Sequence, residues 1–351
     1  MGLRIVDTLV SLIMIPIAGA ILLGISSFFL NPSVFILPSF FALALPYLLL
    51  FHAFITLYWL VRWSRKLWYA LLILLLAGWE MPALWAFNGP GEGEASARVI
   101  TYNVHASYGP SEDLTTQFAT QRKLLEREPH LLCFQEFSSA LATPTLSREF
   151  PNYVHRGQLS VYSKWPIISS DYHKFSKAYN YGGNAYLWVD VESPKGTVRI
   201  FNFHLASIQL GSSEYLFPSS WIHLSSTDSL ELRGRSYFPL LAKGFRFRAE
   251  QQKELLSAIQ ESPYPVLLCG DLNDVPGSHS YWQFAQVYPD AFRQAGWGSG
   301  RTFHSPLFPL RIDYVFNGTP WLPLRAEVLN LQGSDHDPLL IHFALGDAIE
   351  N

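Results

Sequence analysis

Residues 270–274 read Gly270-Asp271-Leu272-Asn273-Asp274 and follow directly after the apolar run Pro265-Val266-Leu267-Leu268-Cys269. An apolar run of this length bounded by turn residues predicts a buried strand. The strand would then present two carboxylates and an amide on a loop at its end. Such groups are costly to bury without partners, and hard oxygen ligands are those that Mg²⁺ prefers. Taken alone, the stretch is equally compatible with a turn rich in Asp and Asn.

Composition divides the chain into an apolar amino-terminal third and an ordinary globular remainder. Charged residues make up 15% of the 351 residues, against about 25% in typical soluble proteins. Between residues 9 and 87 the charged residues are Arg62, Arg65, Lys66 and Glu80 alone. The net charge of −3 provides no global basic field for nucleic acid. Cys133 and Cys269 lie in apolar runs, so we expect reduced core residues rather than a disulfide.

Three apolar segments, at about 9–30, 34–60 and 67–87, are each long enough to cross a hydrocarbon core, which takes about 20 helical residues. We therefore expect residues 1–87 to form a membrane anchor with three transmembrane helices. The basic residues between the second and third segments place that turn, and the amino terminus, in the cytoplasm. Everything after residue 87 then lies on the periplasmic or extracellular side of an inner or plasma membrane. Residues 88–97 predict a flexible polar linker, and 98–351 the soluble domain.

One pattern recurs along the soluble part: an apolar, strand-like run ends on a polar side chain. The side chains presented in this way are Asn103, Glu136, His204 and Asp271, and later runs bring in Asp313, Asp335 and His336. Strands and helices are mixed, without a regular alternation and without a Gly-rich phosphate loop. A layered α/β sandwich is therefore expected.

Six motifs carry a family resemblance across about Arg98–Ala344, the whole soluble part. They are Tyr102-Asn103-Val104, Gln135-Glu136, Asn202-Phe203-His204-Leu205, Gly270-Asp271-Leu272-Asn273-Asp274, Arg311-Ile312-Asp313-Tyr314 and Ser334-Asp335-His336. Their order resembles the endonuclease/exonuclease/phosphatase superfamily, which includes deoxyribonuclease-like enzymes, neutral sphingomyelinases and inositol-polyphosphate 5-phosphatases. The resemblance implies a four-layer sandwich of two mixed β-sheets flanked by helices, with the site at one end of the sheets.

The resemblance also implies a metal site and a histidine that acts on phosphate. Glu136, Asn103 and Asp335 would hold the cofactor, which we expect to be Mg²⁺, with Mn²⁺ as the alternative. His336 would contact the scissile phosphate, stabilising the transition state or acting as an acid. Asp313 would hydrogen-bond the ring of His336, which fixes its tautomer and raises its pKa.

The remaining implied roles concern the attacking water and the phosphate. Asp271 would be the general base, with Asn273 helping to position water and phosphate. His204 would hydrogen-bond a phosphate oxygen, and Asn103 would also contact substrate. The sequence gives less support for a functional role of His105, Asp274 and Asp337. Arg246 and Arg248 open a predicted helix and are as compatible with a solvated helix face as with phosphate binding.

These expected roles together predict a membrane-anchored hydrolase that cleaves a phosphodiester or phosphomonoester by attack of metal-activated water. The expected partners are the lipid bilayer and a phosphoester substrate, namely a lipid headgroup, another small phosphoester or nucleic acid, with no obligate protein partner. A nuclease acting on external DNA or RNA is the alternative, although the sequence has no dense Lys/Arg patch. An inactive, membrane-tethered binding module is a further alternative, against which stands the complete set of site residues. The segment 211–244 is expected to be a long insertion rich in Ser, Gly and aromatic residues.

Overall fold

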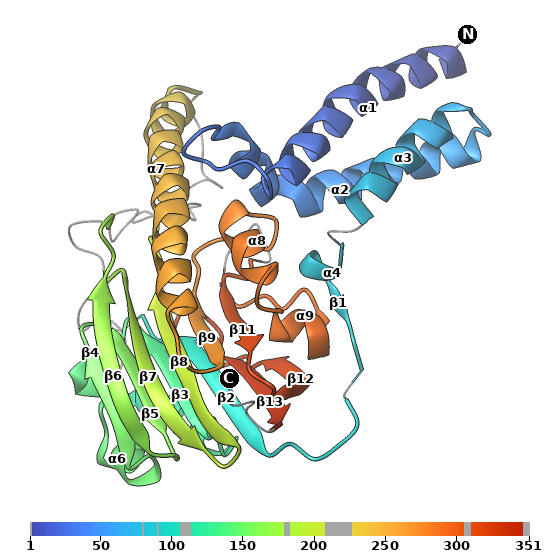
Figure 1. The fold of residues 1–351 in the computed structure, drawn as a ribbon. Coiled ribbons are helices and arrows are strands. Elements are labelled where there is room, and N and C mark those ends of the chain that lie inside the picture. Colours follow the sequence, from blue (N-terminus) through green and yellow to red (C-terminus); the bar gives the residue numbers. More distant parts are fainter. Residues whose placement is uncertain are drawn as a thin grey trace.

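A computed structural model describes residues 2–78, 81–89, 91–105, 114–178, 183–207, 227–304 and 310–346. Figure 1 shows an arm of amino-terminal helices that leans away from a globular part built of sheets and helices. The arm consists of α1 (Gly2–Ser26), α2 (Leu37–Val61) and α3 (Lys66–Gly78). A short helix, α4 (Met81–Leu84), and a two-residue strand, β1 (Ala86–Phe87), connect the arm to the globular part.

Two helices of the described residues, rather than the predicted three, are long and apolar enough to cross a membrane. They cover Leu3–Ser26 and Leu37–Val61. The third predicted span, 67–87, is not among them: its described helix, α3, has 13 residues, about 20 Å at helical rise against a hydrocarbon core of about 30 Å, and residues 79–80 lie outside the described part of the chain. Its predicted end, at Ala86–Phe87, is instead strand β1, paired with β10 (Trp297–Gly298) of the globular part.

The segment that follows β1, predicted as a linker, makes backbone hydrogen bonds to the globular part. The amides of Asn88, Gly91 and Ser96 donate to the carbonyl oxygens of Gly296, Leu324 and Phe343, at 3.1, 2.7 and 2.9 Å. The chain then enters its first long strand at Ala97.

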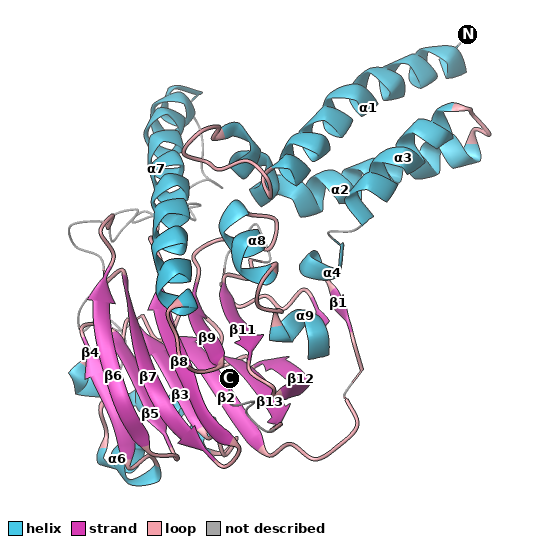
Figure 2. Ribbon diagram, viewed as in Figure 1, coloured by secondary structure: helices cyan, strands magenta, loops and turns pink. Residues whose placement is uncertain are grey.

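Two mixed sheets form the centre of the globular part (Figure 2). The six-stranded sheet has the order β12-β13-β2-β3-β5-β4, and the five-stranded sheet the order β11-β9-β8-β7-β6. Strand bounds are β2 Ala97–Asn103, β3 Leu131–Gln135, β4 Asn152–Arg156, β5 Leu159–Ser163, β6 Ile167–Lys174, β7 Ala185–Ser193, β8 Gly196–His204, β9 Val266–Asp271, β11 Asp313–Gly318, β12 Leu322–Val328 and β13 Leu339–Ala344.

Helices cover the outer faces of both sheets, which confirms the predicted sandwich. The helices are α5 (Leu114–Leu125), α6 (Pro144–Glu149), α7 (Thr227–Gln260), α8 (His279–Ala285) and α9 (Ala291–Ala295), with a 3-10 turn at Ser139–Leu141. Leu124 of α5 packs with Leu132 and Phe134 on the outer face of the six-stranded sheet. Leu255 and Ile259 of α7 pack in the same cluster as residues of β8 and β9, on the outer face of the five-stranded sheet.

The main core lies between the two sheets, where alternate strand residues meet. It includes Val99 and Cys133 from one sheet and Ile200, Leu267 and Cys269 from the other, each fully buried. Both cysteines are free and buried, as predicted. Because successive side chains of a strand face opposite ways, the intervening residues of the same strands form the outer clusters.

Edge strands and short helices were not apparent in the sequence. The sequence-based reading found no strand at β4, β6 or β12, which lie at or near sheet edges and carry mixed polar and apolar residues. The helix expected over 246–261 is the second half of α7, which begins at Thr227. Residues 211–226 of the expected insertion lie outside the described residues.

Candidate active site

Each sheet contains one parallel pair of strands, and the two pairs end side by side. In the first pair, β2 and β3, Asn103 lies opposite Gln135, and Glu136 follows. In the second pair, β8 and β9, His204 lies opposite Asp271. The carboxyl ends of parallel strands meet at one edge of a sheet, so four apolar runs that end on polar residues bring those residues together. The side-chain amide of Asn103 joins the sheets, donating to Asp271 Oδ2 at 3.0 Å and to Glu136 Oε1 at 3.3 Å.

The ends of the two parallel strand pairs, with Asn103, Glu136, His204 and Asp271, form the junction. A histidine–carboxylate pair lies next to it. Asp313 begins β11 and lies directly opposite Asp271 in the antiparallel pairing. His336 Nδ1 is 2.8 Å from Asp313 Oδ2, and His336 Nε2 is 3.8 Å from Asp271 Oδ2. Burial by itself lowers the pKa of His336, but the carboxylate of Asp313 outweighs it and the pKa is raised to about 10. The ring is therefore an imidazolium at neutral pH, with Nε2 directed at the junction.

Asp271 is fully buried and surrounded by groups of both charges. Burial, together with the nearby charge of Asp313, raises the pKa of Asp271 to about 6, against the opposing effects of His336 and His204. A carboxylate that titrates near neutral pH is suited to accept a proton from water. The backbone amide of Asn273 donates to Asp271 Oδ1 at 2.7 Å and holds that carboxylate in place.

The side chains of His204 and Asn273 differ in what they offer to a ligand. His204 Nε2 is 3.5 Å from Glu136 Oε1 and 3.7 Å from Asp271 Oδ2. Neither ring nitrogen of the buried His204 has a hydrogen-bond partner within the described parts of the chain, which suits a ligand contact. Asn273 Nδ2, in contrast, donates to the carbonyl oxygen of Leu205 at 3.1 Å, tying the β9 loop to the end of β8.

Glu136 and Asp335, expected to hold the metal, both approach the same nitrogen of the His105 imidazole. His105 Nδ1 is 3.6 Å from Glu136 Oε2 and 3.5 Å from Asp335 Oδ1. Among the described residues, no hydrogen bond reaches the buried Oε2 of Glu136. A buried carboxylate oxygen left in this way beside a second carboxylate suits a hard divalent cation.

Three residues at or next to the junction have strained backbone conformations. Glu136, Asn273 and His105 have φ angles of 51°, 53° and 48°, in the left-handed region that side chains other than glycine rarely adopt. Such conformations cost about 1–3 kcal/mol each and occur preferentially at functional sites. They turn the chain sharply at the strand ends, which directs these side chains into the junction.

A second group of possible metal ligands overlaps the histidine–carboxylate pair. Ligand atoms of Asp271, Asp313 and His336 lie within 4.8 Å of one another, and all three residues are buried. Asp313 and His336 are already hydrogen-bonded to each other, and His336 carries a proton there at neutral pH. A cation would have to displace that proton. Glu136, whose Oε2 accepts no hydrogen bond from the described residues, is the better centre for a metal.

Several supporting residues were not assigned roles from the sequence. Ser334 lies inside a quoted motif, and its hydroxyl donates to the Asn103 carbonyl oxygen at 2.8 Å and accepts from the His336 amide at 3.1 Å. Thr302, for which the sequence carried no signal, accepts from the Asp313 amide at 3.2 Å. Gln135, also inside a motif, donates to Asn202 Oδ1 at 2.7 Å and links the two sheets beneath the site.

The residues for which the sequence gives less support for a functional role lie outside the junction, except for His105. Asp274 accepts from Arg248 Nε at 3.0 Å, and both residues are buried. The guanidinium of Arg248 is therefore a structural partner of the loop that follows β9 rather than part of a solvated helix face. Arg246 is exposed. Asp337 pairs with His304 Nε2 at 2.8 Å.

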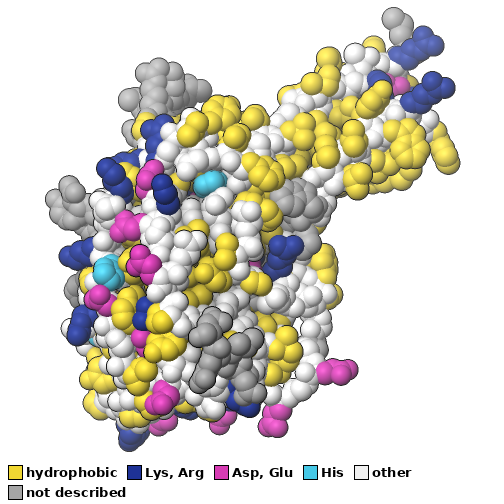
Figure 3. Space-filling model, in the orientation of Figure 1, with side chains coloured by type: hydrophobic (Ala, Val, Ile, Leu, Met, Phe, Trp, Pro, Cys, Tyr) yellow, Lys and Arg dark blue, Asp and Glu magenta, His cyan; other side chains and the backbone are white. Residues whose placement is uncertain are grey.

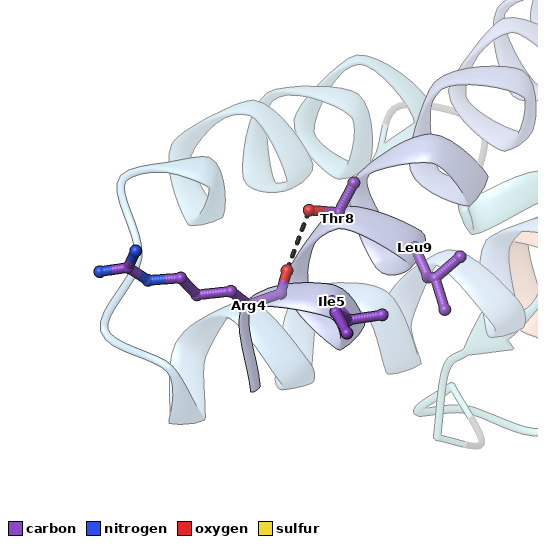
Figure 4. Close-up of a pocket in the computed structure, with 4 residues that line it drawn as sticks. All are labelled: Arg4, Ile5, Thr8 and Leu9. Atoms are coloured by element: carbon purple, nitrogen blue, oxygen red, sulfur yellow. Dashed lines mark hydrogen bonds between the residues drawn. The ribbon is translucent and has the colours of Figure 1, made fainter. Parts of the chain in front are cut away.

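A hollow at the amino-terminal end of α1, lined by Arg4, Ile5, Thr8 and Leu9, is unrelated to this site (Figure 4). All four residues belong to one helix, and the Thr8 hydroxyl donates to the Arg4 carbonyl oxygen at 2.9 Å, within that helix. A groove on the surface of a single helix has no converging polar groups to bind a ligand.

The comparisons with known proteins assign the family. The model of the endonuclease/exonuclease/phosphatase family matches residues 100–336, and the chain belongs to this family. Residues 7–84 match a family model described only as a domain of unknown function. No curated protein matches the chain.

Solved structures share the fold of the globular part. A mannosyl-6-phosphatase from Bacteroides thetaiotaomicron superposes with a TM-score of 0.53 at 15% identity, covering 71% of this chain and 100% of that one. Humanized D. rerio TDP2 and SmcL each superpose with a TM-score of 0.51 at 15% identity, covering 71% of this chain and 99% of theirs. At these identities the likeness concerns the fold alone.

Proposed function

We propose that this protein is a membrane-anchored, divalent-metal-dependent phosphoesterase that hydrolyses a phosphodiester or phosphomonoester. The observation that supports it most is the convergence of Asn103, Glu136, His204, Asp271 and the Asp313–His336 pair at the ends of two parallel strand pairs. The site then contains the three groups that phosphoester hydrolysis requires: a base, a cationic donor and a place for a metal. Members of the family act on phosphoester bonds, which agrees with this assignment.

The side chains divide the chemistry between proton transfer and charge stabilisation. Asp271 accepts the proton of the attacking water, and the amide of Asn273 keeps its carboxylate in position. The imidazolium of His336 donates from Nε2 to an oxygen of the phosphate, while Asp313 holds the ring by Nδ1. His204 and Asn103 donate to further phosphate oxygens. In the low dielectric of a buried site these hydrogen bonds stabilise charge much more strongly than in water.

Glu136, Asp335 and Asn103 would hold the metal, which we propose to be Mg²⁺ or alternatively Mn²⁺. The Oε2 oxygen of Glu136, which accepts no hydrogen bond from the described residues, fits this role. When bound, the cation supplies positive charge that neutralises the phosphate and acidifies water. His105, whose Nδ1 lies near both carboxylates, is placed to orient them.

We further propose that α1 and α2 anchor the enzyme in an inner or plasma membrane. Both helices have the length and apolarity of a span. The basic residues Arg62, Arg65 and Lys66 follow the end of α2, and the positive-inside rule places them in the cytoplasm. The globular part, which joins the opposite end of the α1–α2 pair, then lies on the periplasmic or extracellular side (Figure 1).

The test is turnover of the diester bis(p-nitrophenyl) phosphate and of the monoester p-nitrophenyl phosphate by the full chain in detergent, with Mg²⁺ and after chelation, alongside His336→Ala. Metal-dependent hydrolysis that is lost in the variant is expected. The matched control is His342→Ala, which removes another histidine paired with a carboxylate, Glu327 at 3.0 Å, on β13 rather than at the site. Equal activity of wild type and His336→Ala would refute the site, and absence of turnover with metal present would refute the enzyme.

A further inference from the structure

The loop that leaves the candidate active site ends against the helical arm. Residues 272–278 connect Asp271 of β9 to α8. The hydroxyl of the buried Ser27, at the end of α1, donates to the carbonyl oxygen of Gly277 in this loop. Gly277 also lies against α2: a Cβ there would be 3.5 Å from the Ala42 carbonyl oxygen and 3.7 Å from Leu45 Cδ2. This loop is therefore in contact with α2 and with the residue that directly follows α1.

The turn between α1 and α2 also packs against α8. The ring of Phe28, which is 1% exposed, lies 4.9 Å from that of Trp282. The Phe28 carbonyl oxygen is 3.2 Å from Nδ1 of the buried His279. Figure 1 shows α8 between the sheets and this end of the arm. The arm is thus docked on the globular part at the side where the site residues emerge.

A third connection runs through α7. Phe40 of α2 packs edge-on against Phe245 of α7, with ring centroids 5.4 Å apart. One turn further along α7, Arg248 donates to Asp274, the neighbour of Asn273, at 3.0 Å and to the Ala206 carbonyl oxygen at 2.9 Å. Because these contacts are buried and partly hydrogen-bonded, they hold the loop of residues 272–278 at a set position relative to α1 and α2.

This docking sets the distance of the site from a bilayer. Four peptide units separate Asn273 from Gly277, so the two Cα atoms are at most about 14 Å apart. Gly277 touches α2 at Ala42 and Leu45, in the first three turns of that apolar helix. The headgroup layer of a bilayer is about 5–8 Å thick on each side. The docking therefore keeps Asn273 within reach of the amino-terminal turns of α2, the end of this candidate span that faces the globular part (Figure 1).

The surface around the docked turn is suited to lipid rather than to water. Phe29, Phe35 and Val34 of the turn are 65%, 43% and 87% exposed. Phe238 of α7 is 61% exposed and lies 5.3 Å from the ring of Phe40. Figure 3 shows hydrophobic side chains along the arm and continuing onto the globular part where the two join. This apolar surface is continuous with the two candidate spans, which favours the bilayer itself as what covers it.

We propose that the substrate is the headgroup phosphoester of a lipid in the same bilayer that holds α1 and α2. The proposal rests on the phosphoesterase function and membrane anchoring proposed above. The oxygen of water bonds to phosphorus, one P–O ester bond breaks, and the departing alkoxide takes up a proton. An alcohol and a phosphate are formed, one of which stays in the bilayer with the acyl chains. No oxidant or further reactant is required.

The test uses the full chain in nanodiscs with Mg²⁺. The discs contain labelled phosphatidylcholine, phosphatidylethanolamine, phosphatidylglycerol or sphingomyelin, and the same sample is offered bis(p-nitrophenyl) phosphate and a single-stranded oligonucleotide. We expect turnover of at least one embedded lipid, at a rate above that of the oligonucleotide and abolished in His336→Ala. Phe28→Ala, which loosens the docking, should lower the ratio of lipid to soluble-ester turnover by about tenfold, through loss of effective concentration.

The control for Phe28→Ala is Phe87→Ala. Phe87 also contacts the globular part through its aromatic ring, whose centroid is 6.0 Å from that of Trp297. This contact lies at β10 rather than at residues 272–278, so Phe87→Ala should leave the ratio of lipid to soluble-ester turnover unchanged. Retained turnover of the soluble ester shows that each variant is folded. Hydrolysis of the soluble ester or the oligonucleotide with no hydrolysis of any embedded lipid would overturn the lipid proposal and leave the phosphoesterase standing. Failure to hydrolyse any substrate would overturn both, and an unchanged ratio in Phe28→Ala would overturn the role given to docking.

Discussion

Replacing Asp313 by Asn tests the central pair of the site. His336 Nδ1 and Asp313 Oδ2 are 2.8 Å apart and both residues are buried, so the charge of Asp313 is what keeps the pKa of His336 at about 10 despite burial. An opposite charge at such a distance shifts a pKa by about 1–3 units. Asp313→Asn should therefore lower the pKa of His336 by that amount, because burial then acts with less opposition.

The same shift gives an expected loss of activity. One to three pKa units correspond to about 1.4–4 kcal/mol of stabilisation of the imidazolium. If the imidazolium is the form that acts on phosphate, kcat/KM should fall by at most about twofold near pH 7, where a ring with a pKa of about 7–9 is still at least half protonated, and by roughly 10- to 1,000-fold above about pH 10. The loss should increase with pH, since the variant ring loses its proton at a lower pH than the wild-type ring.

Two measurements check this prediction. The first is an NMR titration of the histidine rings in protein stripped of divalent cations, and the second is kcat/KM against pH with Mg²⁺ present. Glu327→Gln is the matched control, because it removes the carboxylate partner of His342 at 3.0 Å without touching the site, and it should leave kcat/KM unchanged. An unaltered pKa of His336 in Asp313→Asn, or an unaltered kcat/KM, would refute the reasoning.

Three further changes have definite expected outcomes. Burial raises the pKa of Asp271 in the folded protein to about 6, above its value in the unfolded chain. Protonation of Asp271 therefore adds to the unfolding free energy below about pH 4, and this contribution is lost as pH rises through about 6. Asp271→Asn should abolish turnover yet raise the metal-free unfolding free energy at pH 8 by about 1–3 kcal/mol, with no gain near pH 4 in denaturant titrations. Gly270→Ala should lower the unfolding free energy by about 1–3 kcal/mol, because the added Cβ would clash with the Phe203 carbonyl oxygen. Gly89→Ala, where the space is open, is its control in the same unfolding assay and should change little. Glu136→Gln should raise the Mg²⁺ concentration for half-maximal activity at least tenfold, and an unchanged metal titration would show that the cation binds elsewhere.

The amino-acid sequence by itself determined which residues are candidates for the chemistry. Each of Asn103, Glu136, His204 and Asp271 comes at or just after the end of an apolar run, and an apolar run becomes a buried strand through local patterning alone. Polar groups that follow such strands must lie at a sheet edge, where they can be paired or reach a ligand. The family motifs added the expected sandwich, which the two sheets confirm. The edge strands β4, β6 and β12 escaped prediction because their mixed sequences depend on a neighbouring strand for their conformation.

Only the tertiary structure decided how those strand ends meet. The Asn103 amide contacts Asp271 across 168 residues of sequence, and no local pattern indicates which strands are neighbours. The same holds for Arg248, whose burial against Asp274 overrode the exposed helix face that its charge suggested. The end of the third apolar segment, Ala86–Phe87, pairs with Trp297–Gly298, a long-range contact that local apolarity does not indicate. Docking of Phe28 on α8 likewise depends on packing between distant side chains, which hydropathy along the chain does not encode.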